Sequence, residues 1–249
     1  MTNLFDLQIY NKSFSSLITF LEEVLESGSN TIFIATPNPE QIIQAQKNLV
    51  FQKALRSADI LVPDGIGLVW ASRFLANQQV EPIKQRIAGT DVVASLLELA
   101  KNKNLKGLIV GGRDYLPGVE QYRSLSWLEG FADVLRPTLE ENQQIAQVIE
   151  KEQPDLVFVA FGAPNQEEWV ANNLELLRKN KVKIVMVVGG AFDFIFGKIN
   201  RAPGLWQTLG LEWLWRLIKQ PWRIKRQLSL VEFVFKVIKM RLIDKTRCY

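Results

Sequence analysis

The sequence predicts an α/β fold, a doubly wound and mostly parallel Rossmann-like sheet with helices on both faces, followed by a basic helical appendage at the C-terminus. Short apolar runs of strand length alternate with longer segments in which apolar residues recur at helical spacing. Polar or glycine-rich turns follow the apolar runs, and connections of ordinary length join the segments. This alternation is typical of a parallel sheet whose strands are joined by crossover helices.

The first part of the chain is expected to form three strands and three helices. The strands are expected at 5–10, 31–35 and 60–62, and the helices at 14–25, 40–56 and 66–77. Gly28 is expected to end the first helix. Pro63 ends the third strand, and Asp64 and Gly65 follow at the turn. Aspartate often caps a helix, and this is the structural alternative to a functional Asp64.

The second part repeats the alternation. Strands are expected at 108–110, 155–161 and 182–188, with a weaker one at 132–135. Helices are expected at 92–100, 116–128 and 138–151, and a further helix follows the turn at 162–169 and runs to Lys179. Thr90 or Asp91 is expected to cap the first of these helices, and Thr138 and Glu141 form a capping box for the third. We predict two domains, a Rossmann-like domain over residues 1–197 and a helical, basic appendage over residues 198–249.

Composition limits the possible chemistry. The chain of 249 residues is 47% hydrophobic, which is enough for a sizeable core, and it contains no histidine. General acid–base work therefore falls to a carboxylate, lysine or tyrosine, and Ser-His-Asp, Cys-His and imidazole-based zinc sites are excluded. The one cysteine, Cys248, has no partner for a disulfide within the chain, which fits a reducing compartment such as the cytoplasm. Neither a signal peptide nor a membrane-spanning run is expected.

Charge is distributed unevenly along the chain. Residues 198–249 hold 12 lysines and arginines against 3 acidic residues, whereas residues 1–197 hold 18 basic and 23 acidic residues. Four tryptophans lie among the arginines of the tail, and residues 228–243 are apolar on most sides of a helix. Such a tail indicates contact with nucleic acid or with an anionic membrane. The final helix is expected to pack on the body, on a second subunit or at a membrane interface.

Five strand ends carry polar or glycine-rich turns. They contain Thr36 and Asn38, Asp64 and Gly65, Gly111 and Gly112, Gly162 and Gln166, and Gly189, Gly190 and Asp193. In open parallel sheets, ligands bind at the carboxyl ends of the strands, and the helix N-termini that follow favour phosphate. We therefore expect a crevice for a nucleotide-type ligand. The chain has no G-x-G-x-x-G after a strand and no Walker A motif, so a dinucleotide site is a weak option.

Seven segments resemble the WecG/TagA/CpsF glycosyltransferase family in their order and spacing. They are TPNP at 36–39, LVPDGIG at 61–67, RIAGTD at 86–91, FGAPNQE at 161–167, GGAFD at 189–193, GKINRAP at 197–203 and LEWLWRL at 211–217. The resemblance runs from about residue 31 to about residue 226, and beyond Gln227 the tail matches only in character. Segment 130–138 lacks the Gly-His-Gly-Tyr turn of many members, which leaves the donor sugar open.

The resemblance implies an inverting, metal-independent transfer of a sugar from a UDP-sugar to a lipid-diphosphate-linked acceptor at the cytoplasmic membrane face. Asp64 matches the aspartate that acts as the base in the family. Substrate-binding residues are implied or expected at the motifs and turns: Thr36, Asn38, Arg86, Gly89, Gly111, Gly162, Gln166, Gly190 and Asp193. Arginines of the appendage, matching Arg216, Arg223 and Arg226, are implied to reach the active site, where guanidinium groups suit a diphosphate.

We therefore predict a hexosyltransferase that moves a sugar, N-acetylmannosamine or a related hexose derivative, from a UDP-sugar to a polyprenyl-diphosphate-linked saccharide in cell-surface polysaccharide or teichoic-acid-type synthesis. No metal or other cofactor is expected. The protein is expected to be cytoplasmic and peripherally bound to the anionic inner face of the cell membrane, as a monomer or a homo-oligomer. The alternative is a non-catalytic membrane scaffold that binds nucleotide-sugars. A nucleic-acid partner fits less well, because it leaves the crevice unexplained.

Overall fold

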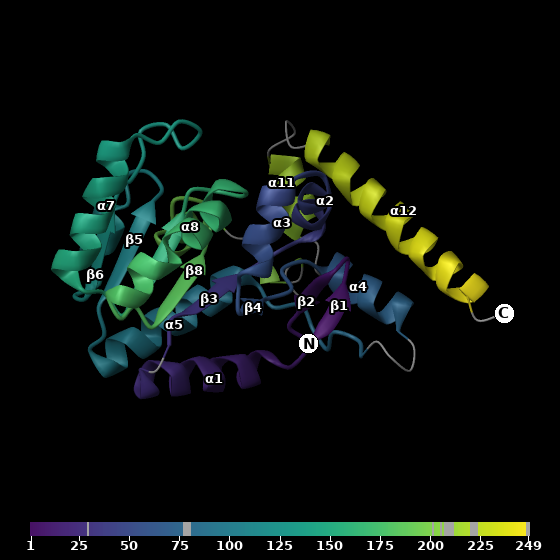
Figure 1. Ribbon diagram of the computed structural model, residues 1–249, viewed down its shortest axis with the longest axis horizontal. Helices are drawn as coiled ribbons and strands as arrows, with labels where there is room; N and C mark the ends of the chain where they lie inside the picture. The colour runs from purple at the N-terminus through teal and green to yellow at the C-terminus, as the bar shows by residue number, and fades with distance from the viewer. Residues whose placement is uncertain are drawn as a thin grey trace.

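The computed structural model describes residues 1–28, 30–76, 81–200, 202–204, 206, 212–219 and 224–247. Within these residues eight strands form one sheet in the order β1-β2-β4-β3-β8-β7-β5-β6, which confirms the α/β prediction (Figure 1). The strands are β1 Thr2–Leu4, β2 Leu7–Ile9, β3 Ile32–Ala35, β4 Ile60–Leu61, β5 Gly107–Gly111, β6 Leu125–Leu128, β7 Leu156–Ala160 and β8 Ile184–Val187. In this part of the chain β1 and β2 pair antiparallel, and the other pairs are parallel.

Helices cover both faces of the sheet (Figure 1). One face is covered by α1 Phe14–Ser27, α5 Gly89–Lys103, the short α6 Leu116–Val119 and α9 Ala191–Ile195. The opposite face is covered by α2 Pro39–Lys47, α3 Leu49–Arg56, α4 Ile66–Leu75, α7 Leu139–Glu152, α8 Asn165–Lys179 and α12 Ile224–Arg247. Along the chain, α11 Glu212–Lys219 comes after α9 and before α12.

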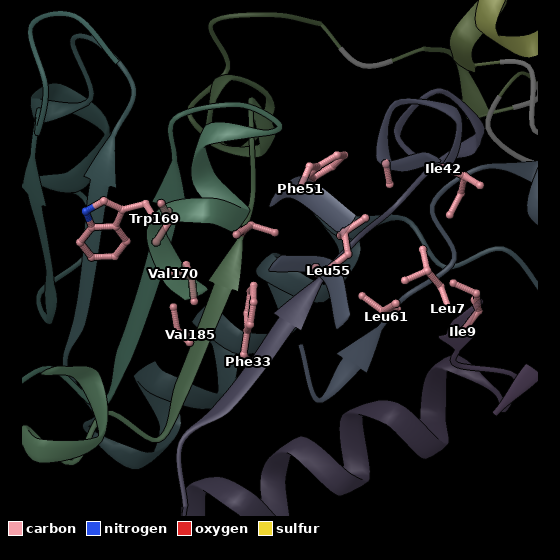
Figure 2. Packing of buried hydrophobic residues seen from close by; sticks show 14 of the residues in the cluster. Leu7, Ile9, Phe33, Ile42, Phe51, Leu55, Leu61, Trp169, Val170 and Val185 are labelled. Carbon is pink, nitrogen blue, oxygen red and sulfur yellow. The ribbon is translucent and has the colours of Figure 1, made fainter. Parts of the chain in front are cut away.

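Successive residues of the central strands point to opposite faces and fill two separate hydrophobic clusters. Phe33 of β3 and Val185 of β8 belong to the first cluster, with Phe51 of α3 packed above them (Figure 2). Ile34 belongs to the second cluster, with Leu17 of α1. All five side chains are fully buried. Because strands covered on both faces need apolar residues at every position, the continuous apolar runs identified them in the sequence.

Several helix ends follow the predicted signals. Helix α1 ends at Gly28, which adopts the left-handed conformation with φ 62°. Helix α7 begins at the predicted capping box, where the Thr138 side chain accepts the Glu141 N–H and the Glu141 carboxylate accepts the Thr138 N–H. These local hydrogen bonds satisfy helix-end N–H groups that have no partner within the helix.

Two elements of the first part differ from the prediction. Residues 40–56 form two helices, because Asn48 ends α2 and caps α3, its Oδ1 accepting the N–H groups of Val50 (2.9 Å) and Phe51 (3.1 Å). Residues 5–10 are not one strand. They include the turn of a β1–β2 hairpin, in which Phe5 and Asp6 have positive φ angles of 54° and 61°.

The predicted helix at 116–128 is wrong beyond its first turn. Helix α6 ends at Val119, and residues 125–128 form β6, which pairs in parallel with β5. Gly107 of β5 allows this pairing, since a Cβ there would lie 2.8 Å from Cδ1 of Leu125. Periodicity alone does not separate a short apolar strand from part of a buried helix.

Two further expectations are wrong. Residues 132–135 form turns rather than a strand, and Leu135 is exposed. Helix α5 begins at Gly89 with Ala88 as its N-cap, so Thr90 and Asp91 lie in its first turn instead of capping it. The earlier start brings the first turn of α5 to the carboxyl end of the sheet, where Thr90 lines a cavity.

Helix α12 packs along α2 and α4 (Figure 1). The side chains of Phe233 and Val237 are fully buried in the same hydrophobic cluster as the sheet residues, and Lys47 of α2 forms a salt bridge with Glu232. One face of the last helix therefore packs on the body, while the domain boundary at 197/198 stays a prediction. No helix in the described ranges is both long enough and apolar enough to cross a bilayer.

Candidate active site

A cavity of about 650 Å³ lies at the carboxyl end of the sheet. Its walls come from the turns after β3, β4, β7 and β8, from α2, from the N-terminal residues of α5, α8 and α9, and from one residue of α12. Eight of the predicted site residues line it: Thr36, Asn38, Asp64, Gly89, Gly162, Gln166, Gly190 and Asp193. These strands are parallel, so turns distant in the sequence end at one edge of the sheet, as a ligand crevice requires.

Asp64 lies in the wall formed by the turn after β4. Its N–H donates to the carbonyl oxygen of Pro37 (3.0 Å), which holds this turn against the turn after β3. The Asp64 side chain is 34% exposed, and its Oδ1 lies 3.5 Å from Nη2 of Arg86. The N-cap of α4 is Gly65, so the interpretation of Asp64 as the cap is wrong. Arg86 reaches the site through its contact with this carboxylate.

Gly65, the N-cap of α4, and Gly67 in its first turn allow α2 to approach α4. A Cβ at Gly65 would lie 3.0 Å from Cδ of Pro39, and a Cβ at Gly67 would lie 2.7 Å from Cγ of the same proline. Asn38, the residue before Pro39, caps α2, with its Oδ1 accepting the N–H of Gln41 (3.1 Å). Asn38 therefore has a structural role and a place in the cavity wall at the same time.

Gly89, the first residue of α5, lies against Thr36. A Cβ at Gly89 would lie 3.2 Å from Cγ2 and 3.3 Å from Oγ1 of Thr36. A larger residue at position 89 would therefore displace the Thr36 side chain, and glycine here keeps the two walls of the cavity close together.

Gln166 joins the turns after β7 and β8. Its Oε1 accepts the N–H groups of Gly162 (3.1 Å) and Gly189 (3.0 Å), and its Nε2 donates to Oε1 of Glu167 (3.1 Å). Burial raises the pKa of Glu167 to about 7. Sequence reasoning did not single out Glu167, because acidic residues are common in the first turn of any helix.

Asp193 is held by Tyr115, a second residue that sequence reasoning missed. The Tyr115 hydroxyl donates to Oδ1 of Asp193 (3.0 Å), and its ring is buried against Phe192 and Phe196. Burial, and then the nearby carboxylate, raise the pKa of Tyr115 well above its ordinary value, so the phenol stays a donor at neutral pH. A Cβ at Gly190 would lie 2.9 Å from Oδ2 of Asp193. The cavity thus presents an oriented carboxylate, which accepts hydroxyl or N–H groups.

The turn that contains Gly111 has a packing role. The Gly111 carbonyl oxygen accepts Nε1–H of Trp127 (2.9 Å), and a Cβ at this position would lie 2.7 Å from Cδ1 of Phe161. A Cβ at Gly112 would overlap the Tyr115 ring, at 2.0 Å from Cε2. Gly111 is not brought into the cavity wall described above. The turn instead supports the tyrosine that holds Asp193.

The tail reaches the cavity through α12, whose Ser229 lines it. Sequence reasoning did not single out Ser229. Arg226 lies one turn earlier on α12, and Arg216 lies on α11, but the side chains of both are outside the described part of the chain. Arg223 lies outside the described residues altogether. Contact of these three arginines with a diphosphate stays a prediction.

Comparison with known proteins gives consistent matches over almost the whole chain. The sequence matches the Glycosyl transferase WecG/TagA/CpsF family over residues 2–247. It is 34% identical over 242 residues to the N-acetylglucosaminyldiphosphoundecaprenol N-acetyl-beta-D-mannosaminyltransferase of Bacillus subtilis (strain 168), covering 95% of this chain and 90% of the relative. The proteins of the same name from Bacillus spizizenii (strain W23) and Staphylococcus aureus (strain MRSA252) are 31% identical over 246 residues and 28% identical over 221 residues. These alignments cover 94% and 86% of this chain, and 89% and 82% of the relatives.

Proposed function

Because the chain belongs to the WecG/TagA/CpsF family of glycosyl transferases, we propose that it moves N-acetylmannosamine, or a related hexose derivative, from a UDP-sugar to a polyprenyl-diphosphate-linked saccharide. The relatives are named as N-acetylmannosaminyltransferases of an N-acetylglucosaminyldiphosphoundecaprenol. The observation that carries the proposal is the position of Asp64, beside Arg86, in the wall of a cavity lined by seven other residues of the predicted site.

Transfer proceeds with inversion and needs one base. The Asp64 carboxylate takes the proton of the acceptor hydroxyl while the hydroxyl oxygen forms a bond to the anomeric carbon. The bond from that carbon to the UDP oxygen breaks, and UDP leaves with the electron pair. The chain has no histidine to compete for the role of base. Asp193, oriented by Tyr115, binds hydroxyl groups of the transferred or accepting sugar.

Departing UDP is stabilised by fixed donors and cations rather than by a metal ion. Arg216, Arg223 and Arg226 are the proposed cations, and α12 supports this assignment because its Ser229 lines the cavity one turn after Arg226. Preorganised charges of this kind stabilise the charge that develops on a leaving group.

The proposal is tested with the full chain and a panel of UDP-sugars. A ligand that binds the folded form raises the melting temperature, and UDP-N-acetylmannosamine is expected to raise it more than UDP-glucose or UDP-galactose. With an N-acetylglucosaminyl polyprenyl diphosphate as acceptor, the product is expected to carry the new bond with inverted anomeric configuration, as read by NMR. Absence of both stabilisation and transfer with every UDP-sugar would contradict the proposal. Stabilisation without transfer would favour a non-catalytic scaffold.

We also propose that the outer face of α12 binds the cytoplasmic face of the membrane. Its apolar side chains point away from the buried Phe233 and Val237 and are exposed: Leu228, Val231, Phe235, Ile238 and Leu242. Lys239 is exposed on the same side of the helix. Apolar side chains enter the lipid interface, and a lysine near an anionic surface contributes about 1 kcal/mol. On the neighbouring α4, the rings of Trp70 and Phe74 stack on each other and are partly exposed.

Replacing both Val231 and Phe235 with aspartate is expected to lower the affinity for phosphatidylglycerol-containing vesicles by about tenfold or more, because two charges then enter the interface. Cosedimentation at several salt concentrations measures this. Leu139→Asp is the control, since Leu139 is also exposed but lies on α7, far from α12 (Figure 1). Equal sedimentation of the double variant and the control would show that α12 does not bind the membrane.

A further inference from the structure

A buried glutamate lies behind the cavity, at the start of α8. Glu167 is 1% exposed, although glutamate is rarely buried without a partner. The cavity wall itself is formed by its neighbour Gln166, so Glu167 acts on the site through other residues. The mechanism proposed above assigns Glu167 no role. Because burying a carboxyl group costs free energy, its buried position indicates that it has one.

The first contact of Glu167 fixes the Gln166 side chain. An amide has one oxygen and one nitrogen, and Oε1 of Gln166 already accepts the Gly162 and Gly189 N–H groups. Its Nε2 therefore has to donate, and Oε1 of Glu167 accepts it at 3.1 Å. Without this acceptor, rotation of the amide would no longer be opposed, and the link between the turns after β7 and β8 would loosen.

The second contact of Glu167 reaches the turn after β3. The same Oε1 accepts Nε2–H of Gln41 at 3.4 Å, and Oε1 of Gln41 accepts the N–H of Asn38 at 3.0 Å. Asn38 and Gln41 both line the cavity. A single buried oxygen therefore joins two glutamines that hold the turns after three neighbouring strands of the sheet, β3, β8 and β7.

We infer that Glu167 is a positioning residue, which holds the turns after β3, β7 and β8 in the geometry that binds the nucleotide of the donor. The inference rests on the proposed function for the identity of the ligand only. The hydrogen-bond geometry that supports it does not depend on that function. A structure built from three separate turns needs such a link, because catalytic and binding groups lose effect when they move by about 1 Å.

Burial favours the neutral form of the Glu167 carboxyl group. Its Oε2 has no hydrogen-bond partner among the described residues. Burying a neutral oxygen without a partner costs less free energy than burying a charged one. Burial raises its pKa, and the adjacent Glu168 adds to the effect. Glutamine has the same shape and no charge, so Glu167→Gln keeps the acceptor. Methionine has a similar length and no acceptor of comparable strength, so Glu167→Met removes it.

The test compares Glu167→Met, Glu167→Gln and the control Glu175→Met, which makes the same change at an exposed position of α8. Loss of a buried acceptor is expected to weaken UDP binding by about tenfold or more in Glu167→Met and by about threefold or less in Glu167→Gln. Glu175→Met is expected to bind UDP like the wild type. Isothermal titration with UDP measures the three values of Kd, and circular dichroism verifies the fold.

A second measurement does not depend on nucleotide binding. Amide exchange of Gly162 and Gly189, followed by NMR, is expected to become about tenfold faster in Glu167→Met and to stay slow in Glu167→Gln. If Glu167→Met does not fold, Gln41→Met is the alternative, because it removes only the hydrogen bonds that link Glu167 to Asn38. This variant is expected to weaken UDP binding while the amides of Gly162 and Gly189 stay protected.

Three outcomes decide the matter. A folded Glu167→Met that binds UDP as the wild type does, with unchanged glycine exchange, overturns the inference. If Glu167→Met does not fold, wild-type UDP affinity in Gln41→Met overturns it. A wild type that binds no UDP counts against the proposed function, and the exchange rates then decide the positioning role alone.

Discussion

Replacing Asp64 with asparagine is expected to lower kcat for glycosyl transfer by about 10²–10⁴-fold, which is the range that a positioned general base contributes. Asparagine keeps the size of the side chain and one of its oxygens, but it does not take a proton from the acceptor hydroxyl. Asp64 lies in the cavity wall and contacts Arg86, so the variant removes the base without opening a hole in the core. Steady-state transfer to a lipid-linked acceptor measures the effect.

Two comparisons separate loss of the base from loss of the fold. The Kd for UDP is expected to change by about threefold or less, because the proton transfer concerns the acceptor and not the nucleotide. Asp114→Asn is the control, since Asp114 is exposed and has a positive φ of 52°, a conformation that asparagine tolerates. A folded Asp64→Asn with turnover near that of this control would rule out Asp64 as the base.

Replacing Phe233 with alanine is expected to lower the free energy of unfolding by about 3–5 kcal/mol, which is the usual cost of removing a buried phenylalanine ring. The Phe233 side chain is fully buried, and its ring centre lies 5.5 Å from that of Phe5 in the β1–β2 turn. For a chain of this length the melting temperature is expected to fall by roughly 10 °C. Urea unfolding followed by circular dichroism measures the change.

The matched control for Phe233 lies two residues further along the same helix. Phe235 is 72% exposed, and Phe235→Ala is expected to change the free energy of unfolding by about 0.5 kcal/mol or less. Equal unfolding midpoints for the two variants would show that α12 is not packed on the body. Deletion of residues 200–249 does not isolate the role of the tail, because it would also uncover the surface that Phe233 and Val237 bury.

The sheet was predictable because its central strands are buried on both faces. Such strands read as continuous apolar runs, of which residues 155–161 are an example. The edge strand β6 was not predictable in the same way. Residues 125–128 are short, half-buried and preceded by a helical turn, and only their pairing with β5 decides their conformation. The break at Asn48 was missed because the apolar pattern continues across it, while a side-chain hydrogen bond ends one helix and starts the next.

The cavity was largely predictable, because parallel strands bring their carboxyl ends to one edge whatever the details of packing. Turn residues such as Asp64 and Gln166 therefore come together as expected. Residues that act through a neighbour were not predictable. Tyr115 lies between the turn at 111–114 and the predicted helix at 116–128, in none of the motifs, and Glu167 resembles an ordinary helix-start acid. Their importance comes from hydrogen bonds that the sequence does not show: Tyr115 donates to Asp193, and Glu167 accepts from its neighbour Gln166 and from the distant Gln41.

The contact between Phe5 and Phe233 has a consequence for synthesis of the protein. Phe5 leaves the ribosome long before Phe233, so the apolar surface on the β1–β2 turn, α2 and α4 stays uncovered on the nascent chain until α12 follows. Exposed apolar surface of this kind attracts chaperones and promotes aggregation. Translation that stalls before α12 therefore yields an aggregation-prone polypeptide. Its cavity also lacks the wall residue Ser229.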